Sequence, residues 1–200
     1  MGEREPKNHL CSFLAFDTET TGLAGKEDTH LIEIAWVKGS FSSPDAKTWD
    51  YLVRPEDVNV PQKITELTGI TDAMLTSSGI PVRHALAAFA EAVKSTDCVI
   101  AHNMSFDKTI IADECCRLGV QDPLNKTPLL CTMKAGVGYG AKKSNRPQRK
   151  TISLINLHKS IFGQAPPVSH RALPDAISCA RCAWVLARMN KFPEQFSFGR

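Results

Sequence analysis

The sequence predicts an α/β domain built on one mixed β-sheet with helices packed against it. Three strand-like segments follow one another near the N-terminus, and the connections between them are too short for crossovers. Farther along, helical segments alternate with short apolar strands before a long final helix. Consecutive antiparallel strands followed by helix–strand–helix units are typical of a mixed sheet covered by helices.

Apolar patterning indicates the first three strands. Residues 12–20 alternate and lead into a turn at 21–23. Residues 30–37 form a nearly continuous apolar run with β-branched and aromatic side chains, which is typical of a buried strand. A third strand is expected at 49–53, after the polar segment 41–47. We expect these three strands to pair antiparallel.

Apolar residues at helical spacing indicate the helices. Gly69, Gly119 and Gly163 mark the ends of three of them, and Ser78 is the candidate cap of another. The expected helices cover residues 61–67, 82–93, 106–118, 152–162 and 172–189. Two further short strands are expected at 97–101 and 129–132.

The composition is that of an ordinary globular chain. Of the 200 residues, 42% are hydrophobic and 22% are charged, which is enough apolar material for a core without disulfide bonds. We therefore expect a single domain over residues 1–200, with its core at about 12–188. The net charge of +3 is compatible with a nucleic-acid partner without demanding one.

The N-terminus and the cysteines indicate a reducing compartment. The first ten residues contain no apolar leader, and no run reaches transmembrane length. The seven cysteines have no regular spacing and are expected to be free thiols. These features predict a cytoplasmic protein with no membrane partner.

Four acidic residues and one histidine are the candidate catalytic residues. They are Asp17, Glu19, Asp107, His170 and Asp175. Asp17 and Glu19 are two residues apart on a predicted strand, so their side chains point to one face. Carboxylate oxygens are the ligands that Mg²⁺ prefers, and histidine can accept a proton near neutral pH. The combination indicates metal-dependent cleavage of a phosphodiester.

Each of these residues has a simpler interpretation when taken alone. An Asp-x-Glu pair is often a solvated strand end. Asp107 and Asp175 fall near the starts of predicted helices, where the helix dipole favours an acid. The functional interpretation depends on the whole set, because every member ends a strand or opens a helix, where clefts form in α/β sheets.

Three motifs resemble a known family. FDTETTGL, HNMSFD and HRALPDA match, in this order, the motifs of the DEDDh family of 3′–5′ exonucleases. Residues 53–75 are similar to the corresponding stretch of its epsilon-subunit branch, from bacterial DNA polymerase III. The resemblance implies a ribonuclease H-like fold, two divalent ions (Mg²⁺ or Mn²⁺) and release of nucleoside 5′-monophosphates from a 3′ end.

The resemblance also implies a role for each candidate catalytic residue. Asp17, Glu19 and Asp175 correspond to direct metal ligands. Asp107 corresponds to the fourth acid, which often acts on the second metal through water. His170 corresponds to the general base that accepts a proton from the attacking water.

A site for the terminal nucleotide is implied beside these residues. The residues that should line or border it are Thr20, Gly22, Leu23, Ile70 and Thr71. Leu23 is expected to lie against the last bases. His102 and Asn103 are expected either to contact substrate or to cap the following helix.

Residues 136–151 form a predicted mobile loop with a strong positive charge. The loop contains no acid and carries Lys142, Lys143, Arg146, Arg149 and Lys150. These side chains either follow a phosphate backbone in a salt-sensitive, sequence-independent contact or are simply solvated.

The sequence favours DNA over RNA without deciding between them. Residues 20–22 resemble the DNA-directed epsilon type, for which a DNA polymerase is a candidate partner. Oligoribonucleases and ribonuclease T share the same five catalytic residues, so RNA is the alternative substrate. A module that binds nucleic acid without catalysis is less favoured, because all five residues are present.

Overall fold

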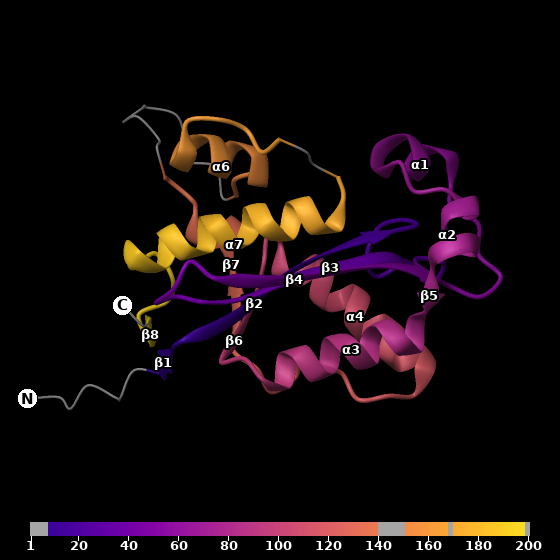
Figure 1. Cartoon of the computed structure of the whole chain (residues 1–200), viewed down its shortest axis with the longest axis horizontal. Coiled ribbons are helices and arrows are strands. Elements are labelled where there is room, and N and C mark those ends of the chain that lie inside the picture. Colours follow the sequence, from indigo (N-terminus) through magenta and orange to yellow (C-terminus); the bar gives the residue numbers. More distant parts are fainter. Residues whose placement is uncertain (1–7, 140–150, 168–169, 199–200) are drawn as a thin grey trace, which may run out of the picture.

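A six-stranded mixed sheet with helices on both faces forms the centre of the molecule (Figure 1). The computed structural model describes residues 8–139, 151–167 and 170–198. The strands are β2 (Ser12–Thr20), β3 (Leu31–Ser40), β4 (Ala46–Arg54), β5 (Ile80–Pro81), β6 (Cys98–Ala101) and β7 (Leu129–Cys131). Their spatial order is β5-β4-β3-β2-β6-β7. Near the chain ends, β1 (Asn8–Leu10) and β8 (Phe196–Phe198) pair separately in parallel.

The pairing directions confirm the expected mixed sheet. β2, β3 and β4 pair antiparallel in sequence order. β6 pairs parallel to β2 and β7, and β5 pairs parallel to β4. In the β2–β3 pair, Glu19 lies opposite Glu33, and the register shifts immediately afterwards at Thr20. β2, the strand that carries Asp17 and Glu19, therefore ends at an irregularity that interrupts its regular pairing with β3.

Helices cover both faces of the sheet, and a separate pair of helices lies at one end of it (Figure 1). α7 lies against one face of the sheet with α6 outside it, and α3 and α4 cover the opposite face. α1 and α2 lie together at the end of the sheet near β5. The bounds are α1 (Gln62–Thr68), α2 (Asp72–Ser78), α3 (Val82–Lys94), α4 (Met104–Leu118), α5 (Thr132–Ala135), α6 (Leu154–Phe162) and α7 (Ala172–Arg188).

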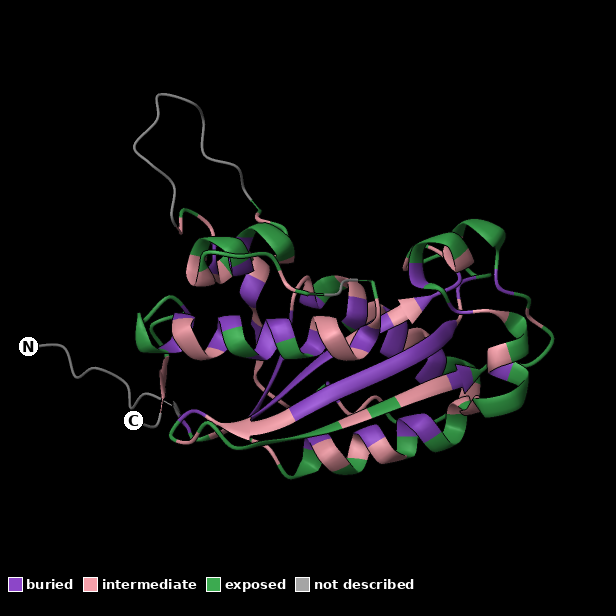
Figure 2. Cartoon of the chain, turned by 45° about the horizontal axis from the view of Figure 1, so that its top comes forward, coloured by how far each residue is buried: buried purple, intermediate pink, exposed green. Residues whose placement is uncertain are grey.

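Alternate side chains of β2 pack into two hydrophobic clusters, one on each face of the sheet. Phe13 and Ala15 pack in the cluster that contains the small residues of α7. Leu14 and Phe16 pack in the opposite cluster with α3 and α4, where the ring of Phe16 lies 4.9 Å from that of Phe89. Figure 2 shows that the central strands are buried over much of their length.

The same alternation directs the polar residues at the end of β2. Side chains two apart on a strand share a face, so Asp17 and Glu19 continue the row of Ala15 toward α7. Thr18 points to the other face, where its hydroxyl reaches Asp107 of α4. The end of β2 thus presents Asp17 and Glu19 toward α7, while Thr18 binds Asp107 of α4 on the other face.

The expected cap of α3 is wrong. Ser78 is the last residue of α2, a helix that the sequence interpretation did not include. Pro81 precedes α3 and no side chain caps it; a fixed φ near −65° suits proline to this position. Thr71 is the N-cap of α2, and its side chain accepts a hydrogen bond from the backbone N–H of Met74.

All seven cysteines are free thiols, as predicted. Within the described part of the chain, no helix combines the length and apolar character needed to cross a membrane.

Candidate active site

Three of the predicted acids converge where β2 meets the start of α7. Asp17 and Glu19 come from the end of β2, and Asp175 comes from the first turn of α7. Each offers a carboxylate oxygen, and these oxygens all lie within 4.8 Å of one another. The three side chains are only partly buried, so a ligand can reach them. This acidic triad is a candidate site for a metal ion.

Asp107 joins the site through the residue between the two strand acids. It lies in the first turn of α4 and is 3% exposed. Its Oδ1 accepts hydrogen bonds from Thr18, at 3.1 Å from the backbone N–H and 2.8 Å from the hydroxyl. Because Thr18 separates Asp17 from Glu19, these bonds fix the fourth acid beside the end of β2.

His170 and Asp175 are connected directly at the start of α7. The backbone N–H of His170 donates to Oδ2 of Asp175 over 2.9 Å. The backbone of His170 has φ of 62°, a left-handed conformation that is uncommon outside glycine. Its side chain is exposed. The carboxylate therefore holds the backbone that carries the imidazole.

Burial raises the pKa of each of the four acids when no cation is bound. Burial, followed by the charges of Asp107 and Asp175, raises the pKa of Asp17 well above its usual range. Burial and the charge of Glu33 raise the pKa of Glu19 to about 8. Burial raises the pKa of Asp107 to about 7, against hydrogen bonds from Thr18. A buried group of like charges is what a bound cation would stabilise.

The chemistry of this donor set fits a hard divalent cation. All donors are carboxylate oxygens, which Mg²⁺ and Mn²⁺ prefer over nitrogen or sulfur. The oxygens of the acidic triad already lie close enough to share an ion. Burial raises the pKa of Asp175 as well, although the N–H of His170 opposes this shift. The arrangement can therefore bind a metal ion beside an exposed histidine.

The predicted nucleotide-site residues at 20–23 form a tight, internally bonded turn. The hydroxyl of Thr20 donates to the carbonyl of Gly22 over 2.6 Å. The hydroxyl of Thr29 donates to the carbonyl of Leu23 over 2.8 Å. Leu23 is 66% exposed, the highest value among the large apolar residues that the structure describes.

Replacing Gly22 by alanine is expected to destabilise this turn. A Cβ at Gly22 would lie 2.9 Å from the Thr29 hydroxyl oxygen, so Thr29 would have to move away from the carbonyl of Leu23. Overpacking of this kind costs about 1–3 kcal/mol, or a fall in Tm of about 2–4 °C per kcal/mol for a chain of this size. Thermal unfolding measures the change.

The Gly22→Ala, Thr29→Ala double variant separates this clash from other effects. Removing the hydroxyl removes the atom that a Cβ would meet. The double variant should therefore lose less stability than the sum of the two single variants. Strict additivity would contradict the clash as the cause.

Ile70 and Thr71 have other contacts in the structure. Ile70 is fully buried in a small cluster with Ile32, Val60 and Leu75, which leaves its side chain no surface for a nucleotide. The side chain of Thr71 caps α2. Both residues therefore act in packing and capping in this conformation.

His102 and Asn103 lie between β6 and α4. Nδ1 of His102 lies 2.9 Å from the Thr132 hydroxyl, and Nε2 lies 3.0 Å from the Ile152 carbonyl. A carbonyl only accepts, so Nε2 carries the proton, and burial lowers the pKa of His102 to about 4. Asn103 takes the N-cap position of α4, but its side chain accepts from Ser105 instead of capping the helix.

The sequence interpretation did not identify Glu33 and Arg171. Glu33 is a fully buried acid in β3 that binds the Arg171 side chain at the start of α7. Its signal is an acid inside the apolar run of residues 30–37, where burial requires a partner. Conversely, the basic residues predicted at 142–150 lie outside the described residues.

Comparisons with known proteins match most of the chain to one family. A family model described as "Exonuclease" matches residues 14–182. The chain belongs to this exonuclease family.

Several curated relatives support this membership. The Treponema pallidum DNA polymerase III subunit epsilon is 31% identical over 84% of this chain and 73% of that protein. The Clostridium perfringens DNA polymerase III PolC-type is 32% identical over 84% of this chain, but the chain spans only 11% of its length. Human three-prime repair exonuclease 1 is 24% identical over 90% of this chain and 65% of that protein. The chain is thus similar to epsilon-type DEDDh exonucleases.

Solved structures show the same fold. A structure of a full-length 3′-exonuclease superposes with a TM-score of 0.74 at 16% identity, over 95% of this chain and 64% of that one. Escherichia coli exonuclease I, solved with a dT13 oligonucleotide, gives a TM-score of 0.69 at 16% identity, over 88% and 41%. The expected ribonuclease H-like fold is confirmed.

Proposed function

We propose that this chain is a metal-dependent 3′–5′ exonuclease that hydrolyses phosphodiester bonds at the 3′ end of DNA. Its substrates would be single-stranded or mismatched ends, and its products nucleoside 5′-monophosphates. Such an activity suits proofreading or repair. The observation that carries the proposal is the convergence of Asp17, Glu19 and Asp175 in a member of the exonuclease family.

The proposed mechanism assigns a task to each of the five residues. Asp17, Glu19 and Asp175 would bind two divalent ions, Mg²⁺ or Mn²⁺, with Asp107 acting through water. When bound, such ions stabilise the attacking and leaving oxygens of an in-line displacement. His170 would accept the proton of the attacking water, as its exposed imidazole and its link to Asp175 permit.

DNA is the favoured substrate because the similar proteins point to it. One solved relative holds a dT13 oligonucleotide, and the curated relatives are named as DNA polymerase III proteins and a repair exonuclease. A DNA polymerase is accordingly a candidate partner. RNA is the alternative substrate, since related exoribonucleases share these five residues. A binding module without catalysis is a weaker alternative, because the acidic triad is complete.

The turn at residues 20–23 is the proposed contact for the terminal nucleotide. Leu23 presents an exposed apolar side chain that would lie against the last base, while Thr29 binds its carbonyl and Thr20 binds that of Gly22. Contact with the face of a base does not select a sequence, because every base presents such a face. The basic segment at 142–150 would add contacts to the phosphates, which salt would weaken.

A time course on 5′-labelled substrates tests the proposal. Matched single-stranded DNA and RNA, and a duplex with a mismatched 3′ end, would be incubated with Mg²⁺, Mn²⁺ or EDTA. We expect a ladder that shortens from the 3′ end with either metal, stops with EDTA and proceeds faster on DNA. The His170→Asn variant, which retains the acidic triad, is the matched control and should be nearly inactive.

The outcomes separate the alternatives. Faster shortening of RNA would replace the DNA assignment by an exoribonuclease. Binding of oligonucleotide without cleavage under any metal, by a folded protein, would contradict catalysis and leave a binding module.

A further inference from the structure

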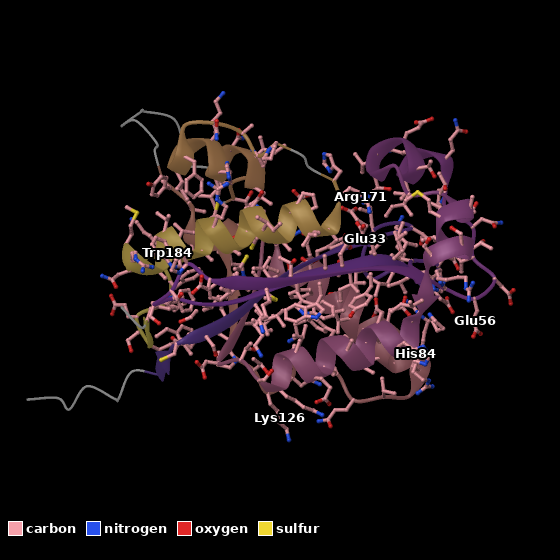
Figure 3. All side chains as sticks on the ribbon, in the orientation of Figure 1. Glu33, Glu56, His84, Lys126, Arg171 and Trp184 are labelled. Atoms are coloured by element: carbon pink, nitrogen blue, oxygen red, sulfur yellow. The ribbon has the colours of Figure 1, made fainter. Side chains whose placement is uncertain are left out.

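A buried ion pair connects the sheet to the start of α7 beside the acidic triad. Glu33 on β3 is fully buried, and the Arg171 side chain is one-third exposed. Nε of Arg171 donates to both carboxylate oxygens of Glu33, at 2.9 and 3.1 Å, and Nη2 binds Oε1 as well. Figure 3 shows Arg171 at the N-terminal end of α7, with Glu33 next to it on the sheet. We call this pair the Glu33–Arg171 clamp.

The clamp also binds the helix backbone. The N–H of Ala172, the first residue of α7, donates to Oε2 of Glu33 over 2.7 Å. The first N–H groups of a helix have no partner within the helix, and a nearby Ser, Thr, Asp or Asn usually supplies one. No side chain next to α7 caps it in this way. An acid from another layer of the fold does so, which fixes the helix start relative to β3.

Both ends of the clamp lie next to candidate catalytic residues. On the strand side, Glu33 lies opposite Glu19 in the β2–β3 register. On the helix side, Arg171 directly follows His170, whose N–H binds the carboxylate of Asp175. The clamp therefore connects the strand position opposite Glu19 to the backbone that binds Asp175.

Stability alone is a poor reason for a buried ion pair at this place. Removing two charges from water costs much of what their attraction returns, and an apolar pair of similar volume is often no less stable. A bidentate guanidinium–carboxylate pair does, however, fix distance and orientation. The left-handed backbone at His170, with φ of 62°, also needs surroundings that hold it in place.

We propose that Glu33 and Arg171 are positioning residues for the hydrolysis proposed above, holding Asp175 and His170 at the correct distance from Asp17 and Glu19. The expected effect of the clamp on turnover rests on the proposed function. The expected effect of the clamp on metal binding does not depend on which substrate is cleaved. Neither residue needs to contact substrate, because both act through the start of α7.

Two conservative variants test the clamp. Arg171→Lys keeps the positive charge but removes the planar fork, and Glu33→Gln keeps the shape but removes the charge. Partners that orient metal ligands typically contribute 10–100-fold in metal affinity or activity. We therefore expect each variant to bind Mn²⁺ about 10–100-fold more weakly by calorimetry. kcat should fall by a similar factor, with a smaller change in KM for DNA.

A second buried pair in the chain provides the matched control. Arg117 binds Glu114, which is 3% exposed, at 2.9 Å, and this pair lies on α4 instead of α7. Arg117→Lys and Glu114→Gln should lower Tm by several degrees, as the clamp variants should. They should leave the Mn²⁺ affinity within about twofold of wild type. The comparison separates loss of stability from loss of position.

Each result bears on the proposal. Wild-type Mn²⁺ affinity and kcat in Arg171→Lys and Glu33→Gln, with a lowered Tm, would overturn it and leave a structural ion pair. Wild-type Mn²⁺ affinity and kcat in Arg171→Lys, with loss of both in Arg171→Met, would also overturn it, because the charge of residue 171 would then suffice without the planar fork. If the wild-type protein hydrolysed no nucleic acid, the proposed function would fail, while the Mn²⁺ affinities of the variants would still decide the clamp.

Discussion

The Asp17→Asn variant is expected to lose hydrolysis and to become more stable when no metal is present. Asparagine has nearly the shape of aspartate, so the fold of β2 should persist. It removes one charge from a partly buried group of acids in which burial and neighbouring carboxylates raise the pKa of Asp17. Loss of a direct metal ligand should lower kcat by at least about a hundredfold, since outer partners alone contribute 10–100-fold. The metal-free Tm should rise by a few degrees, because like charges no longer repel.

The raised pKa values determine whether the metal-free Tm rises or falls with pH. A carboxyl whose pKa is raised on folding stabilises the native state below its unfolded pKa. That contribution is lost as pH rises through the folded pKa. Folding raises the pKa of Glu19 from 4.5 to about 8, mainly through burial. The metal-free Tm of the wild-type protein should therefore fall as pH rises toward 8, and it should fall less in Asp17→Asn, where one repelling charge is absent.

The choice of pH range isolates the acids from His102. Burial lowers the pKa of His102 to about 4, so its contribution to stability changes only between about pH 4 and pH 6.5, in the opposite direction. Thermal unfolding between pH 6.5 and 8, with EDTA or Mn²⁺, measures the acids without a contribution from His102. Mn²⁺ should raise the wild-type Tm more at pH 8 than at pH 6.5, because the metal binds the ionised carboxylates.

An exposed acid provides the control for this experiment. Glu91 on α3 is 72% exposed and pairs with Lys94 at the surface. Glu91→Gln removes one negative charge without touching the site, so kcat, the Tm without metal and the Mn²⁺ shift should stay near wild type. Near wild-type kcat in Asp17→Asn, or an unchanged Mn²⁺ shift, would remove Asp17 from the proposed metal site.

Local sequence patterns were sufficient to predict most of the sheet and its helices. The apolar runs predicted β2, β3 and β4 and their antiparallel order, and glycines marked the ends of α1, α4 and α6. α2 was missed because its apolar residues, at 73–75, are consecutive and show no helical spacing. β1 and β8 are too short for a pattern and depend on pairing between the two ends of the chain.

The sequence placed the acids in a common site, but not the residues that fix their positions. The motif order led to the acidic triad because ligand type and strand spacing are local features. Glu33 occurs in a strand that otherwise reads as core, and its partner Arg171 is 138 residues away. The Thr18–Asp107 bond joins residues 89 apart in the same way. Such contacts follow from the packing of layers, which no local period encodes.

His170→Asn is the variant with the sharpest expected separation of chemistry from binding. A general base typically contributes about 10²–10⁴-fold to the rate, and kcat should fall within that range. Asparagine tolerates the left-handed conformation that His170 adopts, with φ of 62°, better than alanine does. The backbone N–H that binds Asp175 is also retained. The fold of the α7 start and the acidic triad should therefore remain as in wild type.

Three measurements on His170→Asn decide its role. Single-turnover hydrolysis should be slowed, while the Mn²⁺ affinity by calorimetry and the Kd for single-stranded DNA should stay within about threefold of wild type. This pattern is the reverse of that expected for Asp17→Asn, in which metal affinity falls together with kcat. A His170→Asn protein with wild-type turnover would exclude the imidazole as the base. Loss of Mn²⁺ affinity along with turnover would mean that the imidazole itself supports the metal site, because the variant retains the backbone bond to Asp175.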